Sequence, residues 1–376
     1  MKAIFIDNHI GAFLNFRKDV VSSFEKDGWD VSIILPSEDL KTIYMQNMPS
    51  HWKVFGLGLA RDGVNPIKDF VYIKELISVF KKEKPDIVMT YTVKPNIYGA
   101  IACAVCGIPC LSMMAGLGFL FEGNGLKKKL GRALYKFAVK KTKKVTVLNK
   151  SNYDQLISAN FINPDNLVLL EGGEGVDLKK YSRKETNYDD VCFLMIARLI
   201  YDKGYQEYVD AARIVKQKYP SVRIELLGAP WYASPMGVPK DVLEKDIKEG
   251  AITYLGETTD VPSYMRRPGT VIVIPSKYLE GLNRSLMEAC SMGCPIITTD
   301  IPGCRETINK GKNGFLIPKG SSEKLAEAMI KMIELSPEAR VVMAHESRRF
   351  AEQKFDVNNV IDTYKKLTSD ILNNIQ

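Results

Sequence analysis

The sequence of 376 residues contains few of the side chains that bind divalent metals. It has three histidines, His9, His51 and His345, and it has no Asp-x-Asp triplet. Divalent ions in proteins are held by clustered carboxylates, carbonyls or imidazoles, and no such cluster stands out here. We therefore expect no metal ion and no other cofactor.

Long apolar runs are also missing. No apolar stretch reaches the roughly 18 residues that a membrane-spanning helix needs. The amino terminus begins with an apolar strand rather than with the basic and then apolar segments of a signal peptide. We expect a cytoplasmic protein whose length allows two domains, each with its own core.

Seven cysteines are present, and Cys103, Cys106 and Cys110 form their one cluster. A CxxC pair can bind metal or perform redox chemistry. Because neither a second pair nor a histidine lies nearby, reduced thiols in an apolar core are the favoured interpretation.

Acidic residues are absent from one long basic segment, residues 123–150, which holds ten lysines and arginines. Residues 1–180 hold 25 basic against 18 acidic residues, whereas the remainder holds 27 against 26. Within the segment, Leu126, Leu130, Leu134, Phe137 and Ala138 recur at helical spacing. This pattern indicates a basic amphipathic helix that could lie on an anionic membrane surface, although its apolar stripe could equally be core packing. The candidate lipid contacts are Lys127, Lys128, Lys129, Lys140, Lys141, Lys143 and Lys144.

Nucleic acid is a weaker alternative for the same segment, because no aromatic interleaving or reader motif accompanies the charge. We expect no nucleic-acid partner.

Short apolar strands alternate with helical stretches along most of the chain, which is typical of parallel sheets with helices on both faces. Ligands of such sheets bind beyond the carboxyl ends of the strands. A polar stretch, residues 179–190, interrupts the alternation and is interpreted as a linker between two domains. The expected strands are 3–6, 31–35, 54–57, 87–91, 109–113, 145–148, 191–196, 222–227, 252–255, 271–274, 295–299 and 315–317. The expected helices are 14–26, 69–82, 97–106, the basic segment, 205–217, 322–335, 337–354 and 357–374.

The most informative segment is residues 271–289, VIVIPSKYLEGLNRSLMEA. The buried strand 271–274 should be followed by a loop and then by a helix that starts near Arg284, with Asn283 as its N-cap. Glu280 then lies in the loop and Glu288 about one turn inside the helix, so both carboxylates can face one ligand. Gly281 allows close approach, and the first helical turn favours an anion. This combination suits a sugar joined to a phosphate.

The wider segment resembles the donor-site signature of the retaining glycosyltransferases of family four. The matching positions are Ser276, Glu280, Gly281, Leu282, Glu288, Ala289, Gly293, Pro295, residues 296–300, Gly303 and Glu306. The resemblance runs through most of the chain and is specific mainly from Gly172 to Gly314.

The resemblance implies the α/β fold called GT-B, in which two Rossmann-like, doubly wound parallel-sheet domains face each other across a cleft. The acceptor-side domain would comprise residues 1–180, with the final helix, 357–376, crossing back onto it. The donor-binding domain would comprise residues 181–356. The implied activity is metal-independent, retaining transfer of a sugar from a nucleotide sugar, expected to be a UDP-sugar, to a growing lipid-linked or surface polysaccharide. Such an enzyme would work peripherally on the inner face of the cell membrane.

In the same resemblance, Glu288 holds the ribose hydroxyls and Glu280 the hydroxyls of the transferred sugar. The N–H groups of Gly281, Leu282 and Asn283 would meet the sugar and the diphosphate. The departing phosphate would take the proton of the acceptor, so Glu280 is a positioning group rather than a nucleophile.

Two cations, Arg198 and Lys203, follow the strand 191–196 and should lie at its carboxyl edge. The resemblance assigns them to the donor diphosphate, where fixed positive charge would stabilise the leaving group. Alternatively, both are surface cations of a loop without a role in ligand binding.

Three further segments complete the expected donor site. Gly11 lies in the first turn after a strand, beside His9, which could contact the acceptor or could simply cap a helix. The turn 172–177 supplies Gly175, and Glu174 within it should point away from a diphosphate or meet a cation. Gly256 and Val261 are assigned to the edge that binds the base.

The acceptor side is expected along residues 92–98 and 115–119, which also follow strands. These segments resemble those of enzymes that extend lipid-linked or capsular oligosaccharides. The candidate contacts are Lys94, Asn96, Gly116 and Gly118.

Two other classes remain open from the sequence. A nucleotide-sugar 2-epimerase could share the fold, and would convert the sugar nucleotide without an acceptor. A non-catalytic subunit that binds a nucleotide sugar is the other, although it need not keep Arg198, Lys203, Glu280 and Glu288 together.

Overall fold

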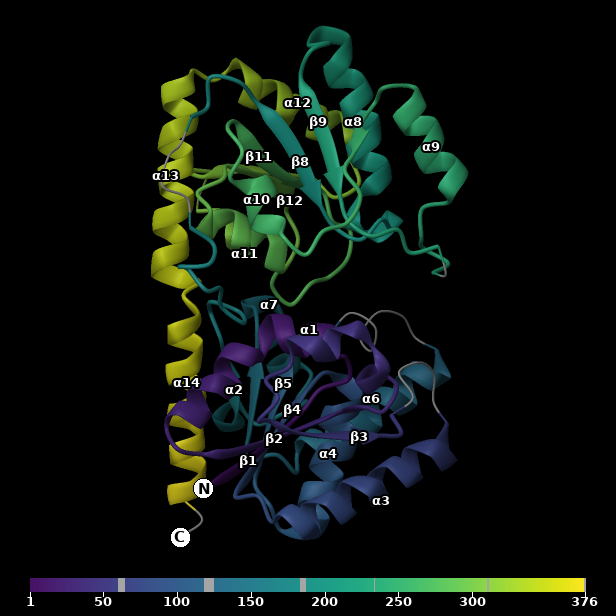
Figure 1. Ribbon diagram of the computed structural model, residues 1–376, viewed down its shortest axis with the longest axis vertical. Coiled ribbons are helices and arrows are strands. Elements are labelled where there is room, and N and C mark those ends of the chain that lie inside the picture. Colours follow the sequence, from purple (N-terminus) through teal and green to yellow (C-terminus); the bar gives the residue numbers. More distant parts are fainter. Residues whose placement is uncertain (60–64, 118–124, 183–186, 233, 310, 375–376) are drawn as a thin grey trace. The chain divides into compact units, whose positions relative to one another are not determined.

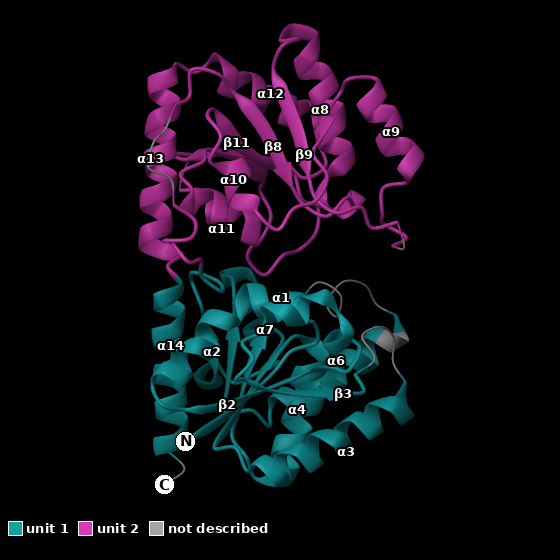
Figure 2. Ribbon diagram, in the orientation of Figure 1, with its two compact units in different colours: residues 1–175, 357–376 teal, residues 176–356 magenta. Residues whose placement is uncertain are grey.

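The computed structural model describes residues 1–59, 65–117, 125–182, 187–232, 234–309 and 311–374. The chain divides into two compact units, which are considered separately (Figure 2). Unit 1 comprises Met1–Gly175 and Val357–Gln376, and unit 2 comprises Val176–Asp356.

Unit 1 contains a seven-stranded sheet in the order β3-β2-β1-β4-β5-β6-β7, and every pairing is parallel. Buried runs rich in β-branched and other apolar residues make the inner strands, as expected for a sheet covered on both faces. The strands are β1 (Lys2–Ile6), β2 (Asp30–Pro36), β3 (Lys53–Leu57), β4 (Ile87–Tyr91), β5 (Cys110–Met114), β6 (Lys144–Val147) and β7 (Leu167–Leu169).

Helices cover the sheet of unit 1 (Figure 1). Helix α4 lies between α3 and α6, and the carboxyl-terminal helix α14 packs beside α2. The helices are α1 (Ile10–Phe16), α2 (Lys18–Lys26), α3 (Pro66–Glu83), α4 (Val93–Cys106), α6 (Leu126–Val139), α7 (Lys150–Ser158) and α14 (Val357–Asn373). Cys103 and Cys110 are buried and unbridged, so they are core thiols in this unit.

Unit 2 contains a six-stranded parallel sheet in the order β10-β9-β8-β11-β12-β13. Its strands are β8 (Cys192–Ile196), β9 (Arg223–Leu227), β10 (Thr253–Tyr254), β11 (Thr270–Ile274), β12 (Ile296–Thr299) and β13 (Gly314–Ile317). Its helices are α8 (Tyr205–Lys218), α9 (Lys240–Lys248), α10 (Val261–Met265), α11 (Arg284–Ser291), α12 (Ser322–Glu334) and α13 (Pro337–Lys354). Helices α8 and α12 are neighbours, as are α11 and α13.

Two expectations about the elements were wrong, and four elements were missed. The helix expected over 14–26 is two helices that meet at Arg17. The described residues of the expected linker, 179–190, are packed into unit 2. Tyr181 and Tyr188 are buried there. The Tyr188 hydroxyl donates to the carbonyl oxygens of Thr270 and Gly293. The tyrosine rings supply apolar area that the polar composition of this stretch concealed. Strand β7 and helices α7, α9 and α10 were not predicted.

Candidate functional site

In each sheet, one pair of neighbouring strands marks the point where the strand order reverses. In unit 2 this pair is β8 and β11, and in unit 1 it is β1 and β4. Loops that leave such a pair at the carboxyl ends diverge and leave a crevice, which is where open α/β sheets bind ligands. The residues that follow β8 and β11 are those for which the sequence predicted a donor site.

In unit 2, the structure brings together two of these predicted residues. The ammonium group of Lys203, from the loop after β8, forms an ion pair with the carboxylate of Glu280, from the loop after β11. Their side chains are 15% and 14% exposed. The two loops are also joined by the N–H of Lys277, which donates to the carbonyl oxygen of Asp202 over 2.7 Å. A largely desolvated ion pair therefore lies at the reversal point.

Glu280 is further held by two neighbours on its own loop. The side-chain amide of Asn283 donates to Glu280 Oε1 over 3.1 Å, and the Ser276 hydroxyl lies 3.4 Å from the same oxygen. Three donors on one carboxylate oxygen fix its orientation, which is what a group that positions a sugar requires.

Asn283 also confirms the predicted start of α11. Its Oδ1 accepts the N–H of Leu286 over 3.1 Å, so one amide caps the helix and holds Glu280 at once. The predicted use of the Asn283 N–H for ligand binding is wrong in this structure, because that N–H donates to the carbonyl oxygen of Gly303 over 2.8 Å. The roles expected for the N–H groups of Gly281 and Leu282 stay predictions.

Two glycines allow these loops to approach each other. Gly204 has φ +86°, and a Cβ there would lie 2.1 Å from the Pro275 carbonyl oxygen. Gly303, at φ +85°, faces the Glu280 backbone, and a Cβ there would lie 2.6 Å from Glu280 Cβ. A side chain at either position would displace the loop that carries Glu280.

Glu288 lies in the second turn of α11 and is 8% exposed. Its Oε1 accepts from Arg284 Nε over 2.7 Å. The Tyr181 side chain lies beside both groups: burial, and then the charge of Glu288, raise the pKa of Tyr181. The sequence did not indicate Tyr181 as a partner, because Tyr181 falls in the stretch interpreted as a linker.

Arg198 follows β8 and is exposed. Its guanidinium carbon lies 4.3 Å from the centre of the Trp231 ring, which the loop after β9 presents. Within the described residues, Arg198 forms no ion pair. Trp231 could have been predicted here, because β9 is the neighbour of β8 in a parallel sheet and both loops leave at the same edge.

Both expected base-binding positions lie in the segment that follows β10, the strand at one end of the same sheet. Gly256 has φ +79° and its carbonyl oxygen accepts the N–H of Gly228 over 2.8 Å. Val261 is the first residue of α10, which Asp260 caps.

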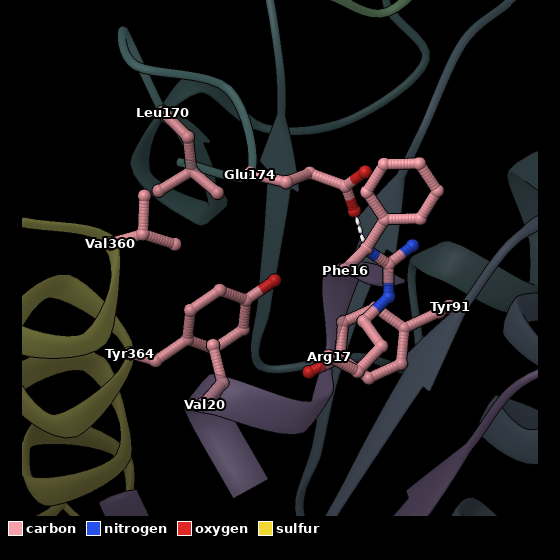
Figure 3. Close-up of a pocket in the computed structure, with 8 residues that line it drawn as sticks. All are labelled: Phe16, Arg17, Val20, Tyr91, Leu170, Glu174, Val360 and Tyr364. Carbon is pink, nitrogen blue, oxygen red and sulfur yellow. Dashed lines mark ion pairs between the residues drawn. The ribbon is translucent and has the colours of Figure 1, made fainter. Parts of the chain in front are cut away.

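In unit 1, a buried ionic cluster lies close to the reversal point (Figure 3). Arg17, at the junction of α1 and α2, pairs with Glu174 and lies 3.3 Å from the Asp7 carboxylate, and its guanidinium carbon stacks 4.3 Å from the centre of the Tyr91 ring. Burial raises the pKa of Asp7 to about 6, although Arg17 acts in the opposite direction. Glu174 thus meets a cation, as expected. The small pocket beside the cluster is lined by Phe16, Arg17, Val20, Tyr91, Leu170, Glu174, Val360 and Tyr364.

Gly175 and Gly11, the two glycines predicted for the site in unit 1, are each explained by close local contacts. A Cβ at Gly175, which has φ +69°, would lie 2.5 Å from Val357 Cα at the start of α14. A Cβ at Gly11 would lie 2.9 Å from the His9 ring. That ring is folded back so that His9 Nδ1 accepts the N–H of Ala12 over 3.3 Å, which is the capping role considered for His9.

The expected acceptor residues do not form one group. Asn96 is fully buried, and its amide donates to the Met113 carbonyl oxygen and the Tyr135 hydroxyl over 2.8 and 2.7 Å. The prediction that Asn96 contacts a sugar is therefore wrong, because its donors stabilise the core between α4, β5 and α6. Lys94 lies 3.5 Å from the Asp69 carboxylate with 14% of its side chain exposed.

Gly116, which follows β5, is partly exposed, whereas Gly118 lies outside the described residues. Thr92, directly after β4, has φ 71° and ψ 172°. A β-branched residue is strained at positive φ, and such strain tends to occur at functional positions. Nothing in the sequence indicated this backbone conformation of Thr92.

The basic helix α6 has two apolar faces instead of one. Tyr135, Ala138 and Val139 are buried and Leu134 packs against the core, whereas Leu130 and Phe137 are 67% and 55% exposed. The side chains of Leu126 and Lys127 lie outside the described part of the structure. Of the other candidate lipid contacts, Lys129, Lys140, Lys141 and Lys143 are exposed, and Lys128 and Lys144 are partly so. In the described residues, no helix is both long and apolar enough to cross a bilayer.

Two family models match the chain. The model described as Glycosyl transferases group 1 matches residues 178–350, and the model described as Glycosyl transferase 4-like matches residues 9–149. The first match lies within unit 2 and the second within unit 1.

Two relatives that match over most of the chain are both named as glycosyltransferases. The chain is 25% identical to the N,N'-diacetylbacillosaminyl-diphospho-undecaprenol alpha-1,3-N-acetylgalactosaminyltransferase of Campylobacter jejuni, with 98% of each chain covered. It is 24% identical to the UDP-Gal:alpha-D-GlcNAc-diphosphoundecaprenol alpha-1,3-galactosyltransferase of Escherichia coli, with 92% of this chain and 90% of that one covered.

Solved structures share the fold. Alr3699/HepE of Anabaena, crystallised in complex with UDP, superposes with a TM-score of 0.80 at 18% identity, over 98% of this chain and 100% of that one. Together with the two parallel-sheet units, this likeness shows the GT-B fold. The protein is an enzyme of the glycosyltransferase class. It belongs to the GT-B glycosyltransferases, and the two transferases named above are among its relatives.

Proposed function

We propose that this protein transfers a hexosyl or N-acetylhexosaminyl group from a UDP-sugar to a lipid-linked glycan, with retention of configuration and without a metal ion. The observation that carries the proposal is the Lys203–Glu280 ion pair at the reversal point of unit 2, with Arg198 on the same loop, whose guanidinium stacks on Trp231 and forms no ion pair among the described residues. The names of the relatives, whose acceptors are undecaprenyl-diphosphate-linked sugars, support the acceptor class.

In this proposal the donor lies along the carboxyl edge of the unit 2 sheet. Glu280 accepts hydrogen bonds from the hydroxyls of the sugar, and Glu288 accepts them from the ribose. Gly256 and Val261 lie near the base. The two carboxylates suit these roles because each is held by a cation of its own unit, Lys203 and Arg284 respectively, and so is oriented before the donor binds.

Chemistry at the anomeric carbon breaks its bond to the β-phosphate oxygen, and the diphosphate gains negative charge. Arg198, Lys203 and the amino end of α11 would stabilise that charge as fixed positive groups and dipoles. The acceptor hydroxyl oxygen forms the new bond on the same face of the sugar, and its proton passes to the departing phosphate oxygen. No protein base is required, and Glu280 positions the sugar.

Attachment to an anionic membrane surface through α6 is part of the same proposal. Exposed Leu130 and Phe137 lie seven positions apart, and therefore on one face of the helix, beside exposed lysines. Lysines contribute roughly 1 kcal/mol each near an anionic surface, and exposed apolar side chains add the energy of burial in the interface. The enzyme would then act at the inner face of the cell membrane, where a lipid-linked acceptor is held.

The direct test is a transfer assay with a panel of UDP-sugars, a synthetic polyprenyl-diphosphate-linked saccharide and excess EDTA. We expect a product whose new linkage has the α configuration of the donor, as determined by NMR. An inverted linkage, a need for added Mg²⁺ or Mn²⁺, or conversion of the sugar nucleotide without an acceptor would contradict the proposal. Glu280→Gln is the matched inactive control.

A further inference from the structure

Trp231 lies on a loop that is fastened to the segment carrying Arg198. The N–H of Leu199 donates to the Ala229 carbonyl oxygen over 3.0 Å, and the N–H of Tyr201 donates to the Met236 carbonyl oxygen over 2.9 Å. The N–H of Val238 donates to the Leu199 carbonyl oxygen over 3.1 Å. These backbone hydrogen bonds fix the two loops relative to each other. The backbones that carry Trp231 and Arg198 are therefore held in place.

The turn after Trp231 is tight. The carbonyl oxygen of Trp231 accepts the N–H of Ser234 over 3.0 Å, and a Cβ at Gly237 would lie 2.1 Å from that oxygen. The backbone at Trp231 is therefore constrained, although the residue as a whole is 42% exposed.

Arg198 and Lys203 differ in what compensates their charge. Lys203 has a carboxylate partner, Glu280, whereas Arg198 is held by an aromatic face at 4.3 Å. A guanidinium that stacks on a ring keeps its five N–H donors in plane and unoccupied, while a carboxylate partner would engage two of them. Stacking thus orients the group without reducing its capacity to bind phosphate.

We propose that Trp231 is a positioning residue for the donor diphosphate, and that it acts by holding the Arg198 guanidinium in the orientation that contacts the phosphates. This inference rests on the proposed function, which places the diphosphate at Arg198. Trp231 itself does not touch the nucleotide, so its contribution passes entirely through Arg198.

A double-mutant cycle on UDP binding, measured by titration calorimetry on the full-length protein, tests the inference. Stacking of an exposed cation on an indole is worth about 0.5–1 kcal/mol, which corresponds to a factor of about 2 to 5 in the dissociation constant. Trp231→Leu should raise the dissociation constant by that factor, and Trp231→Phe should restore most of the affinity. In an Arg198→Ala background, Trp231→Leu should have no further effect.

The neighbouring Tyr232, which is 54% exposed, provides the matched control. Tyr232→Leu removes an aromatic side chain from the same loop, and UDP affinity should stay within twofold. An equal loss in Tyr232→Leu would show that the loop surface, and not the stacking on Arg198, supports binding. Unfolding midpoints of all variants would show that the fold is retained.

Tryptophan fluorescence provides a second reading. The chain has three tryptophans, and Trp29 and Trp52 both belong to unit 1, so the wild-type emission minus that of Trp231→Phe isolates Trp231. Saturation with UDP should change this difference spectrum, because the guanidinium over the ring gains an anionic partner.

The possible failures are distinguishable. If Trp231→Leu weakens UDP binding equally with and without Arg198, or has no effect in the presence of Arg198, the positioning role is overturned. If Arg198→Ala binds UDP as well as the wild type, the placement of the diphosphate itself fails, and with it the proposed function.

Discussion

Lys203 and Glu280 lie 77 positions apart in the sequence, and their side chains form an ion pair where β8 and β11 end. Both side chains are mostly removed from water. Breaking one member of such a pair leaves the other charged and unpartnered, which is more costly than losing a surface pair.

The first prediction concerns this pair. Lys203→Ala should abolish most transfer activity and lower the free energy of unfolding by roughly 1–3 kcal/mol, because Glu280 loses its cation in a partly buried site. Lys203→Arg, which keeps the charge, should recover most of the stability and less of the activity. Thermal unfolding and transfer rates would be measured together. Unchanged stability of Lys203→Ala would show that the pair is not formed in solution.

The second prediction separates the two roles of Asn283. Asn283→Ser keeps an N-cap hydroxyl for α11 but removes the amide that donates to Glu280. Stability should stay within about 0.5 kcal/mol of the wild type, whereas transfer should fall by at least fivefold. Asn283→Ala should lose about 1 kcal/mol in addition, since the cap is also removed. Wild-type activity of Asn283→Ser would mean that Glu280 does not depend on this amide.

The third prediction concerns pH. Burial raises the pKa of Asp7 to about 6, above its ordinary value of 3.8, so folded unit 1 holds this proton more tightly than the unfolded chain does. The contribution of Asp7 to stability should therefore be greatest below pH 4 and should decrease as the pH rises to about 6, by at most about 1.4 kcal/mol per pH unit. The advantage of the wild type over Asp7→Asn should shrink across this range.

Unfolding of unit 1 can be followed by Trp29 and Trp52 in a Trp231→Phe background, at pH values from 4 to 7. Asp154→Asn, which alters a carboxylate with 58% of its side chain exposed, is the control and should show no such trend. A difference for Asp7→Asn that is flat or grows with pH would mean that Arg17 keeps Asp7 ionised throughout.

The fourth prediction concerns the basic helix. Changing Lys129, Lys140 and Lys141 to glutamine should reduce sedimentation with anionic phospholipid vesicles at low salt, and the difference should fade as salt increases. Leu130→Ser with Phe137→Ser should reduce sedimentation at all salt concentrations, because apolar burial is not screened. The same charge change at Lys240, Lys245 and Lys248 of α9 is the control. Equal sedimentation of all variants would refute the attachment surface.

Much of the fold could be predicted because its strands are short, buried and apolar. The strand over 271–274 and the helix beginning at Arg284 with its Asn283 cap are present as expected. Strand β7, with three residues of which two are half-buried, carries too weak a pattern to be recognised. Local periodicity did not predict the break at Arg17, the residue that pairs with Glu174 from the other end of unit 1.

The grouping of the candidate residues was predictable to the extent that residues after adjacent parallel strands share an edge. That rule brought Arg198, Lys203 and Glu280 to one region. It did not reveal the partners that determine what each side chain can do, namely Trp231 for Arg198 and Tyr181 for Glu288. Asn96 shows the opposite error, because a polar residue near a strand end can equally satisfy the core.

The most direct test of the account is a calorimetric titration of UDP into the wild-type protein and into Arg198→Ala, with both proteins in excess EDTA. The account predicts that the wild type binds without a divalent ion and that Arg198→Ala binds at least tenfold more weakly with its fold intact. Wild-type binding that appears only after Mg²⁺ or Mn²⁺ is restored, or equal affinity of the two proteins, would contradict it.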